Sequence, residues 1–340
     1  MRLRMVDLQA PGLRRERRGR GFRYLDTAGA PVTDPAQLER VRALAIPPAW
    51  TDVWICPWSN GHVQALGTDT ARRRRQYLYH EEFRARQELA KQEHVREFAA
   101  ALPLLRERTA ADLAMRGLSR ERVSVCAVRL LDLGFFRIGT RAYARDNQTY
   151  GLTTMLREHV VCRGGEISFS YPGKAAVRQV RALVDPPAYE AVRALLRRRR
   201  GEGQLFEFWY ERRWHGLTST DLNVRLKEFA GMDVTAKDFR TWHATVLAAV
   251  GLAVSTPAGH GSPTARKLAV ARVVKEVSHY LGNTPAVCRA SYINPRLIEL
   301  YEEGRTIADE LGRLGEGAAF GHPATQGPVE EAVRRLLDGD

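Results

Sequence analysis

The hydrophobic pattern of this chain changes near Glu81, and this change constrains the fold more than any other feature of the sequence. Before this point, short aromatic and alternating stretches are separated by turn signals. Strands expected at 52–56 and 62–66 flank an Asn-Gly pair, which favours a hairpin because it supplies positive φ cheaply. After it, long stretches rich in Ala, Leu, Arg and Glu follow a helical period and are broken at Pro103 and Gly117. The sequence therefore predicts an α+β protein.

The domain organisation follows from the same change. With 340 residues, the chain is long enough for two or three domains. We expect a small β-rich N-terminal domain with one helix at residues 1–88 and a larger, mainly helical domain with a small β-hairpin element at 89–313. Residues 314–340 hold several glycines and prolines before a final helical stretch, and we expect them to form a loosely attached tail.

The charge of the chain indicates a polyanionic partner. Lys and Arg number 53 and Asp and Glu number 39, which gives a formal net charge of +14 and makes nucleic acid the leading candidate. The four cysteines form no C-x-x-C pair, so neither a disulfide framework nor a zinc site is expected. Residues 1–20 hold many arginines and no continuous apolar run. We therefore expect no signal peptide or membrane anchor, and a cytoplasmic protein.

Two runs of arginine, at 72–75 and 197–200, are candidate nucleic-acid contacts, although each alone is equally typical of a solvated surface. The first run leads directly into a stretch that mixes amide and aromatic side chains. Amides can read adenine edges and aromatic rings can pack on sugars or methyl groups, so this strip suits a DNA groove. Core packing of the tyrosines is the alternative. The candidate DNA contacts here are Arg72, Arg73, Arg74, Arg75, Gln76, Tyr77 and Tyr79.

Two further arginines occupy positions from which they could bind a phosphate. Arg137 follows an apolar run, and a buried Arg can hold two phosphate oxygens through its planar guanidinium. A salt-bridged structural arginine is the alternative interpretation. Arg240 lies in the first turns of a helix expected to be capped by Thr235, on the same face as Lys237. The backbone N–H groups and the helix dipole favour an anion at that place.

Three more candidate residues lie at turns or helix ends. Lys174 follows the Pro-Gly pair that ends a strand expected at 166–171, so it sits at or just after a hairpin tip. Asn283 follows Gly282, the expected end of a helix, where Asn is also common as a simple turn former. Tyr292 lies nine residues after Asn283, between two expected helix starts, where an ordinary packed tyrosine is the alternative.

The order of these residues along the chain resembles that of the poxvirus-like and bacterial type IB DNA topoisomerases. The matching pieces are Phe136-Arg137-Ile138-Gly139, Lys174 after a hairpin turn, Lys237-Asp238-Phe239-Arg240, Leu281-Gly282-Asn283 and Ser291-Tyr292. The helical stretch after Gly139 holds Arg141 and Tyr143, which are further candidate DNA contacts. Tyr143 with Asn147, and the segment Tyr150-Gly151-Leu152-Thr153-Thr154, also resemble the DNA-contacting helix of this family, and the strip from Gln76 to His80 resembles its groove-reading strip. The resemblance covers most of the chain.

This resemblance implies a β-rich domain and a mainly helical catalytic domain that close around duplex DNA. It also implies a monomeric, nucleoid-associated bacterial enzyme. In the family scheme, the catalytic arginine, lysine, arginine and tyrosine are Arg137, Lys174, Arg240 and Tyr292. Asn283 falls where many relatives have a histidine, which leaves a hydrogen-bond donor for a phosphate oxygen but removes a cationic one.

The chemistry of phosphodiester cleavage explains this set of residues. A tyrosine that attacks phosphorus stores the linkage as a phosphotyrosyl ester, so the strand can be religated without ATP. Two arginines can activate the phenol and stabilise the charge of the transition state. Lys174 is the best-placed general acid for the leaving 5′ oxygen, with Lys237 in support. Because cations of the protein replace metal ions in this scheme, no cofactor is expected.

Two other functions stay open at this point. Tyrosine recombinases share the Arg, Lys, Arg, Tyr logic, but their second arginine usually lies in a His-x-x-Arg context, whereas here Lys237 precedes Arg240. Their N-terminal part is a helical core-binding domain rather than a β-rich one. A basic, non-catalytic DNA-binding protein would explain the charge but not the ordered catalytic set.

Overall fold

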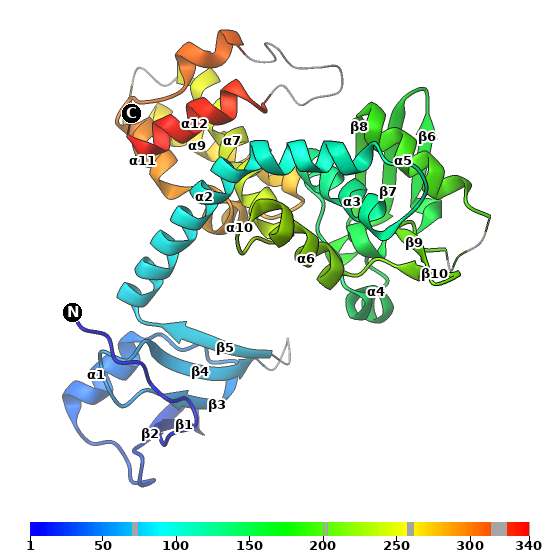
Figure 1. Ribbon diagram of the computed structural model, residues 1–340. Coiled ribbons are helices and arrows are strands. Elements are labelled where there is room, and N and C mark those ends of the chain that lie inside the picture. Colours follow the sequence, from blue (N-terminus) through cyan, green and yellow to red (C-terminus); the bar gives the residue numbers. More distant parts are fainter. Residues whose placement is uncertain (70–73, 200, 202, 257–261, 314–324, 340) are drawn as a thin grey trace. The chain divides into compact units, whose positions relative to one another are not determined.

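The computed structural model describes residues 1–69, 74–199, 201, 203–256, 262–313 and 325–339. The chain divides into two compact units, Met1–Glu93 and His94–Asp340. The first is rich in strands and the second is mainly helical, so the predicted α+β class is confirmed (Figure 1). Helix α2 (Glu81–Leu113) contributes residues to both units. Among the described residues, we find no helix with the length and apolar character that crossing a membrane requires.

The N-terminal unit consists of an antiparallel sheet and one short helix. Its elements are β1 (Leu13–Arg18), β2 (Gly21–Leu25), α1 (Pro35–Ala43), β3 (Trp50–Ile55), β4 (Val63–Asp69), β5 (Arg74–Tyr79) and the start of α2. In the described part of the sheet the strand order is β2-β1-β3-β4-β5. The predicted hairpin joins β3 to β4 across Asn60 and Gly61. Ile55 and Ala65 pack with Val41 of α1 in the core of this unit.

The second unit is mainly helical and carries two small sheets. Its α-helices after α2 are α3 (Arg120–Gly134), α4 (Arg141–Asn147), α5 (Pro186–Arg197), α6 (Ser219–Ala230), α7 (Ala236–Val254), α9 (Pro263–Leu281), α10 (Pro285–Ser291), α11 (Pro295–Glu302) and α12 (Pro328–Asp338). Short 3-10 helices are η1 (Leu152–Thr154), η2 (Arg157–His159), η3 (Lys174–Ala176) and η4 (Ala308–Arg313). The strands are β6 (Val160–Arg163), β7 (Glu166–Pro172), β8 (Arg178–Val184), β9 (Glu207–Tyr210) and β10 (Arg213–Gly216). The first three strands form one antiparallel sheet and the last two form a hairpin.

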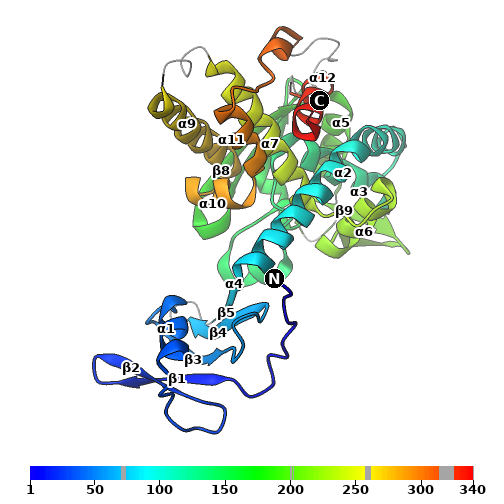
Figure 2. The same cartoon turned by 90° about the vertical axis from the view of Figure 1, so that its left-hand side faces the viewer.

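Helix α7 lies in the middle of the helical packing of this unit. Helices α9 and α11 contact α7, and α10 contacts α9, as Figures 1 and 2 both show. Phe239 and Trp242 on α7 are buried in the main core. The helix starts at Thr235 as predicted, because the Thr235 N–H donates to the Asp238 carboxylate at 2.8 Å in a capping box.

Helix α2 continues through Pro103, where the sequence predicted a break. A proline removes one backbone donor from a helix and crowds the preceding turn. Here Leu102 and Leu105 on either side of it are buried in the main core. The packing of this face therefore holds the helix together despite the lost hydrogen bond.

The last helix, α12, packs into the second unit, so residues 325–339 do not form the loosely attached tail that their composition predicted. Val329 and Val333 are fully buried. The Glu330 carboxylate accepts hydrogen bonds from Arg106 Nη1 at 2.6 Å and from Trp242 Nε1 at 2.9 Å. No local sequence pattern predicts these partners, because they lie far from Glu330 along the chain.

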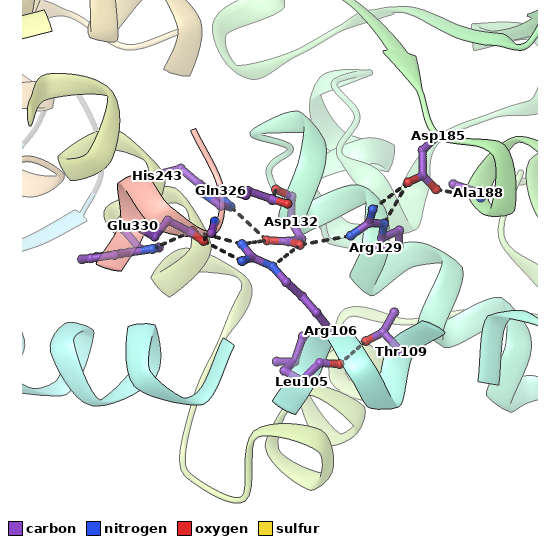
Figure 3. Close-up of polar contacts among 12 residues, drawn as sticks. Leu105, Arg106, Thr109, Arg129, Asp132, Asp185, Ala188, His243, Gln326 and Glu330 are labelled. Atoms are coloured by element: carbon purple, nitrogen blue, oxygen red, sulfur yellow. Dashed lines mark hydrogen bonds and ion pairs between the residues drawn. The ribbon is translucent and has the colours of Figure 1, made fainter. Parts of the chain in front are cut away.

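Glu330 belongs to a buried ionic network, which Figure 3 shows. Arg106 also donates to both carboxylate oxygens of Asp132 at 2.9 Å, and His243 Nε2 lies 3.4 Å from Asp132 Oδ1. Burial alone would raise the pKa of Asp132, but the charge of Arg106 holds this pKa far below its usual range. The network joins α2, α3, α7 and α12, and it therefore fixes the helix that carries Arg240.

Candidate active site

Arg240 lies early in α7 and is almost fully buried, with 4% exposure. Its Nη1 donates to the Phe135 carbonyl and its Nη2 donates to the Leu281 carbonyl at 2.8 Å. Its Nε is buried and has no hydrogen-bond partner among the described residues. Burial, and after it the nearby charge of Arg137, lower the pKa of Arg240 to about 10. A buried cation with a free donor makes a place for an anion.

Arg137 lies beyond the end of α3 and reaches the end of α9. The chain leaves α3 through Phe135, whose φ of 55° lies in the left-handed region. Arg137 Nη2 donates to the Gly282 carbonyl at 2.8 Å and to Asn283 Oδ1 at 2.6 Å. Both arginines therefore bind the last turn of α9 through oxygen atoms that carry no formal charge.

Asn283 follows the left-handed cap Gly282, whose φ is 60° and which ends α9 as predicted. The backbone N–H of Asn283 donates to the Ser278 carbonyl at 3.0 Å and so fixes this turn. Because Asn283 Oδ1 accepts from Arg137, the amide Nδ2 is left as a donor. Nδ2 is buried and without a partner in the described part of the chain. A second free donor is thus present just beyond the end of α9, to which Arg240 also binds through the Leu281 carbonyl.

Tyr292 is the residue at which α10 ends, and its N–H donates to the Cys288 carbonyl at 3.0 Å. Its ring is half-buried, and Arg240 Cζ lies 5.3 Å from the ring centroid. Burial alone would raise the pKa of Tyr292. The charge of Arg240 and a hydrogen bond with its side chain, followed by the charges of Arg137 and Lys237, outweigh this effect, and the pKa is lowered. The phenol is therefore easier to ionise than an ordinary tyrosine.

The two candidate lysines lie on the surface. Lys237 is exposed in the first turn of α7, close enough to contribute to the lowered pKa of Tyr292. Lys174 is exposed on the turn between β7 and β8, which confirms its predicted place at a hairpin tip. Arg181 of β8 donates to the Tyr280 carbonyl at 2.8 Å and so ties this hairpin to the end of α9. The structure thus brings Arg137, Arg240, Asn283 and Tyr292 together and places Lys174 on a neighbouring element.

Comparison with known proteins identifies the family. Residues 80–312 match the family described as "Eukaryotic DNA topoisomerase I, catalytic core", and residues 21–69 match "Bacterial DNA topoisomerase IB, N-terminal domain". The chain belongs to the type IB DNA topoisomerases. It is 28% identical over 300 residues to DNA topoisomerase 1B of Acanthamoeba polyphaga mimivirus, a match that covers 86% of this chain and 88% of the viral protein. The protein is therefore an isomerase of DNA topology, and the predicted resemblance is confirmed.

In this type IB topoisomerase, residues Gln76–Tyr79 of the strip predicted to read a DNA groove lie on β5, between the two matched ranges. Tyr77 and Tyr79 are 39% and 43% exposed and stack at 5.9 Å between ring centroids, so they are surface residues rather than core residues. Gln76 is partly exposed and Arg75 is exposed. Arg72 and Arg73, together with the side chain of Arg74, lie outside the described residues.

A cavity of about 620 Å³ in the N-terminal unit adjoins this strip. Tyr77 and Tyr79 line it, and so do Phe83 and Lys91 of α2, which the sequence did not single out. Tyr79 also stacks on Phe83 at 5.5 Å. The exposed aromatic surface of β5 is therefore extended along the start of α2.

The other DNA-contact candidates have different surroundings. Tyr143 is 41% exposed on α4, and Arg141 is exposed at the start of this helix, where its Nη2 donates to the Gly216 carbonyl at 3.2 Å. In the second arginine run, Arg198 is buried and pairs with Glu207 at 3.1 Å. Arg198 is thus a structural residue rather than part of a solvated surface.

Sequence reasoning missed Gln179 and Arg181, which connect the Lys174 hairpin to α9. The alternating pattern of β8 gives no sign of either role, because a single partly buried polar residue in a strand is ordinary. The signal that could have found them is the pair of glycines, Gly173 and Gly282, directly before Lys174 and Asn283. A missing side chain at such a position permits a close approach by another residue.

Proposed function

We propose that this topoisomerase relaxes supercoiled duplex DNA by transient cleavage of one strand, rotation and religation, without ATP or a metal ion. The Tyr292 phenolate attacks the scissile phosphorus, a bond forms between the phenolic oxygen and phosphorus, and the bond from phosphorus to the 5′ oxygen breaks. The product is a 3′-phosphotyrosyl enzyme and a free 5′ hydroxyl. Religation is the reverse attack by that hydroxyl.

The convergence of two cations and two free donors beside one tyrosine carries this proposal. Arg240 Nε and Asn283 Nδ2 are buried, and neither has a partner among the described residues. Leaving such groups unpaired is unfavourable unless a ligand satisfies them, and a phosphate offers the required acceptor oxygens. Arg137 and Arg240 supply the charge that stabilises the pentacoordinate transition state.

The reaction involves two proton transfers, one from the attacking phenol and one to the leaving 5′ oxygen. The phenol of Tyr292 loses its proton before or during attack, which its lowered pKa favours. The leaving 5′ oxygen is a strongly basic alkoxide and takes a proton from Lys174, with Lys237 in support. The exposed position of Lys174 on a turn suits an amine that must approach the DNA rather than pack in the core.

Binding of duplex DNA by this chain rests on different residues. The net charge of +14 supplies the attraction, and the stacked Tyr77 and Tyr79 with Gln76 present a flat aromatic and amide surface on β5. Arg141 and Tyr143 on α4 provide a second contact. Action as a monomer that closes around DNA within the nucleoid stays a prediction.

The decisive experiment compares Tyr292→Phe with the wild type on supercoiled plasmid, without ATP and with a chelator present. The change removes one oxygen and almost no volume, so folding and DNA affinity should persist while relaxation and the covalent adduct disappear. Tyr280→Phe is the matched control, because Tyr280 is exposed near the same site and should remain fully active.

Each competing function gives a different result in this assay. A tyrosine recombinase would require paired sites, and a non-catalytic DNA-binding protein would leave the linking number unchanged. Peptide mapping of the wild-type adduct should place the DNA on Tyr292 through a 3′ phosphate. An active Tyr292→Phe variant, or an adduct on a 5′ phosphate, would contradict the proposal.

A further inference from the structure

The side chain of Gln179 crosses two glycines that flank the candidate active site. Gln179 lies on β8 opposite Tyr171 of β7. A β-carbon added to Gly173 would lie 2.6 Å from Gln179 Cγ, and one added to Gly282 would lie 2.9 Å from Gln179 Oε1. Real β-carbons do not approach other atoms so closely, so a larger residue at position 173 or 282 would displace the Gln179 side chain from this arrangement.

These two glycines immediately precede residues of the proposed site. Gly173 leads into Lys174, on the hairpin turn, and Gly282 leads into Asn283, at the end of α9. One side chain therefore lies against both turns.

Arg181 holds Gln179 in this position. Arg181 Nη2 donates to Gln179 Oε1 at 3.1 Å and to the Tyr280 carbonyl at 2.8 Å. Gln179 Nε2 in turn lies 3.4 Å from the Val177 carbonyl within the hairpin. The amide is therefore oriented by partners on both the hairpin and, through Arg181, the last turn of α9.

We propose that Gln179 is a positioning residue that sets the Lys174 turn against the Asn283 turn and thereby aligns the lysine amine with the leaving 5′ oxygen. This inference rests on the proposed role of Lys174 as general acid. Proton delivery is effective only within hydrogen-bond reach of the oxygen, so a small shift of the turn should slow cleavage strongly. Gln179 itself transfers no proton and touches no reacting atom.

The test uses the full-length protein and two DNA substrates that differ in one atom. One has the normal 5′-bridging oxygen at the cleavage site, and the other has sulfur there. Sulfur is a better leaving group that needs little protonation, so loss of general-acid function should be rescued on the sulfur substrate. Single-turnover cleavage rates are measured for wild type, Lys174→Ala, Gln179→Ala and the double variant. Val180→Ala is the matched control, because Val180 is a 64% exposed neighbour on the same strand.

We expect Gln179→Ala to slow cleavage of the oxygen substrate by about tenfold or more and to cleave the sulfur substrate at close to the wild-type rate. The double variant should cleave the oxygen substrate no more slowly than Lys174→Ala alone, because both changes remove the same function. Val180→Ala should match the wild type on both substrates. Gln179→Met keeps the length of the side chain but loses the amide, and it should show the same rescue if Gln179→Ala folds poorly.

The results that would contradict this inference differ from those that would contradict the proposed function. The sulfur substrate could restore the cleavage rate of Lys174→Ala while both Gln179 variants cleave the two substrates with equally reduced rates. In that case Gln179 does not act through Lys174 and this inference is wrong. If Lys174→Ala itself is not rescued, the proton step of the proposed function is wrong and the inference falls with it. If the fold-reductions in cleavage rate of the two single variants multiply in the double variant, the two residues act independently, and the inference is wrong as well.

Discussion

At the scale of single residues, burial and nearby charges have opposite effects on the pKa of the Tyr292 phenol. Burial disfavours the phenolate, whereas Arg240, Arg137 and Lys237 favour it and lower the pKa. If the phenolate is the attacking species, the cleavage rate should rise with pH through the pKa of Tyr292. Arg240→Ala removes the largest favourable charge and should therefore move the rising limb to higher pH, besides lowering the maximum rate.

Single-turnover cleavage measured from about pH 6 to pH 10 tests this expectation, because the range lies around and below the ordinary pKa of tyrosine. Lys237→Ala serves as the comparison. Lys237 is the last and smallest of the named influences on Tyr292, so its removal should shift the profile less. An Arg240→Ala profile that stays in place or moves to lower pH would show that Arg240 does not activate the phenol.

At the scale of elements, the attachment of α12 depends on Glu330. Removing this carboxylate leaves Trp242 Nε1 without its acceptor and leaves Arg106 with Asp132 alone. Breaking a buried ion pair by removing one partner destabilises a protein by about 3–5 kcal/mol. Glu330→Ala should therefore lower the free energy of unfolding by roughly this amount in urea titrations of the full chain. Glu331→Ala is the control, since Glu331 is 54% exposed on the same helix and should change stability by less than about 0.5 kcal/mol.

The sequence predicted the elements of this region much better than their contacts. Thr235, Gly282 and the Pro residues that follow Thr284 and Asn294 carry local capping signals, and each helix begins or ends where these signals predict. The passage of α2 through Pro103 was not predictable, because it depends on the burial of neighbouring leucines. The docking of Glu330 on Arg106 was not predictable either, since no local pattern reports a contact between residues so far apart.

The candidate site shows the same division. Its residue types and their order were predicted from the resemblance to the type IB topoisomerases, and the chemistry of phosphodiester cleavage explains why such residue types are needed. The binding of Arg240 to the Phe135 and Leu281 carbonyls, and the passage of Gln179 between two glycines, required the three-dimensional structure. A hydrogen bond to a backbone carbonyl cannot be predicted from the type of the accepting residue, since every residue has a carbonyl.

At the scale of the whole molecule, the excess of positive charge should make DNA binding strongly dependent on salt. Each phosphate contact releases counterions, so the logarithm of the association constant should fall linearly with the logarithm of salt concentration, with a slope near −0.9 for each contact. Arg75→Ala should reduce the magnitude of this slope by about one and weaken binding equally on all sequences. Tyr77→Ala should leave the slope unchanged and alter the choice of cleavage site.

Fluorescence anisotropy across a range of salt concentrations measures the slope, and mapping of covalent adducts on plasmid DNA measures the site choice. A slope near zero for the wild type would contradict the electrostatic account. A change of slope in Tyr77→Ala would show that this tyrosine serves phosphate binding rather than base contacts.

The turn that carries Lys174 has a consequence for how this enzyme can evolve. Ala175 and Ala176 have φ values of 61° and 59°, a left-handed conformation that costs alanine about 1–2 kcal/mol relative to glycine. Glycine at either position would relieve this strain, but it would also let the turn sample many more shapes. A substitution to glycine that raises thermal stability would then leave the position of the Lys174 amine less well defined, whereas the two alanines keep the turn in one conformation. Variants selected only for resistance to heat should therefore gain glycine here at the expense of turnover.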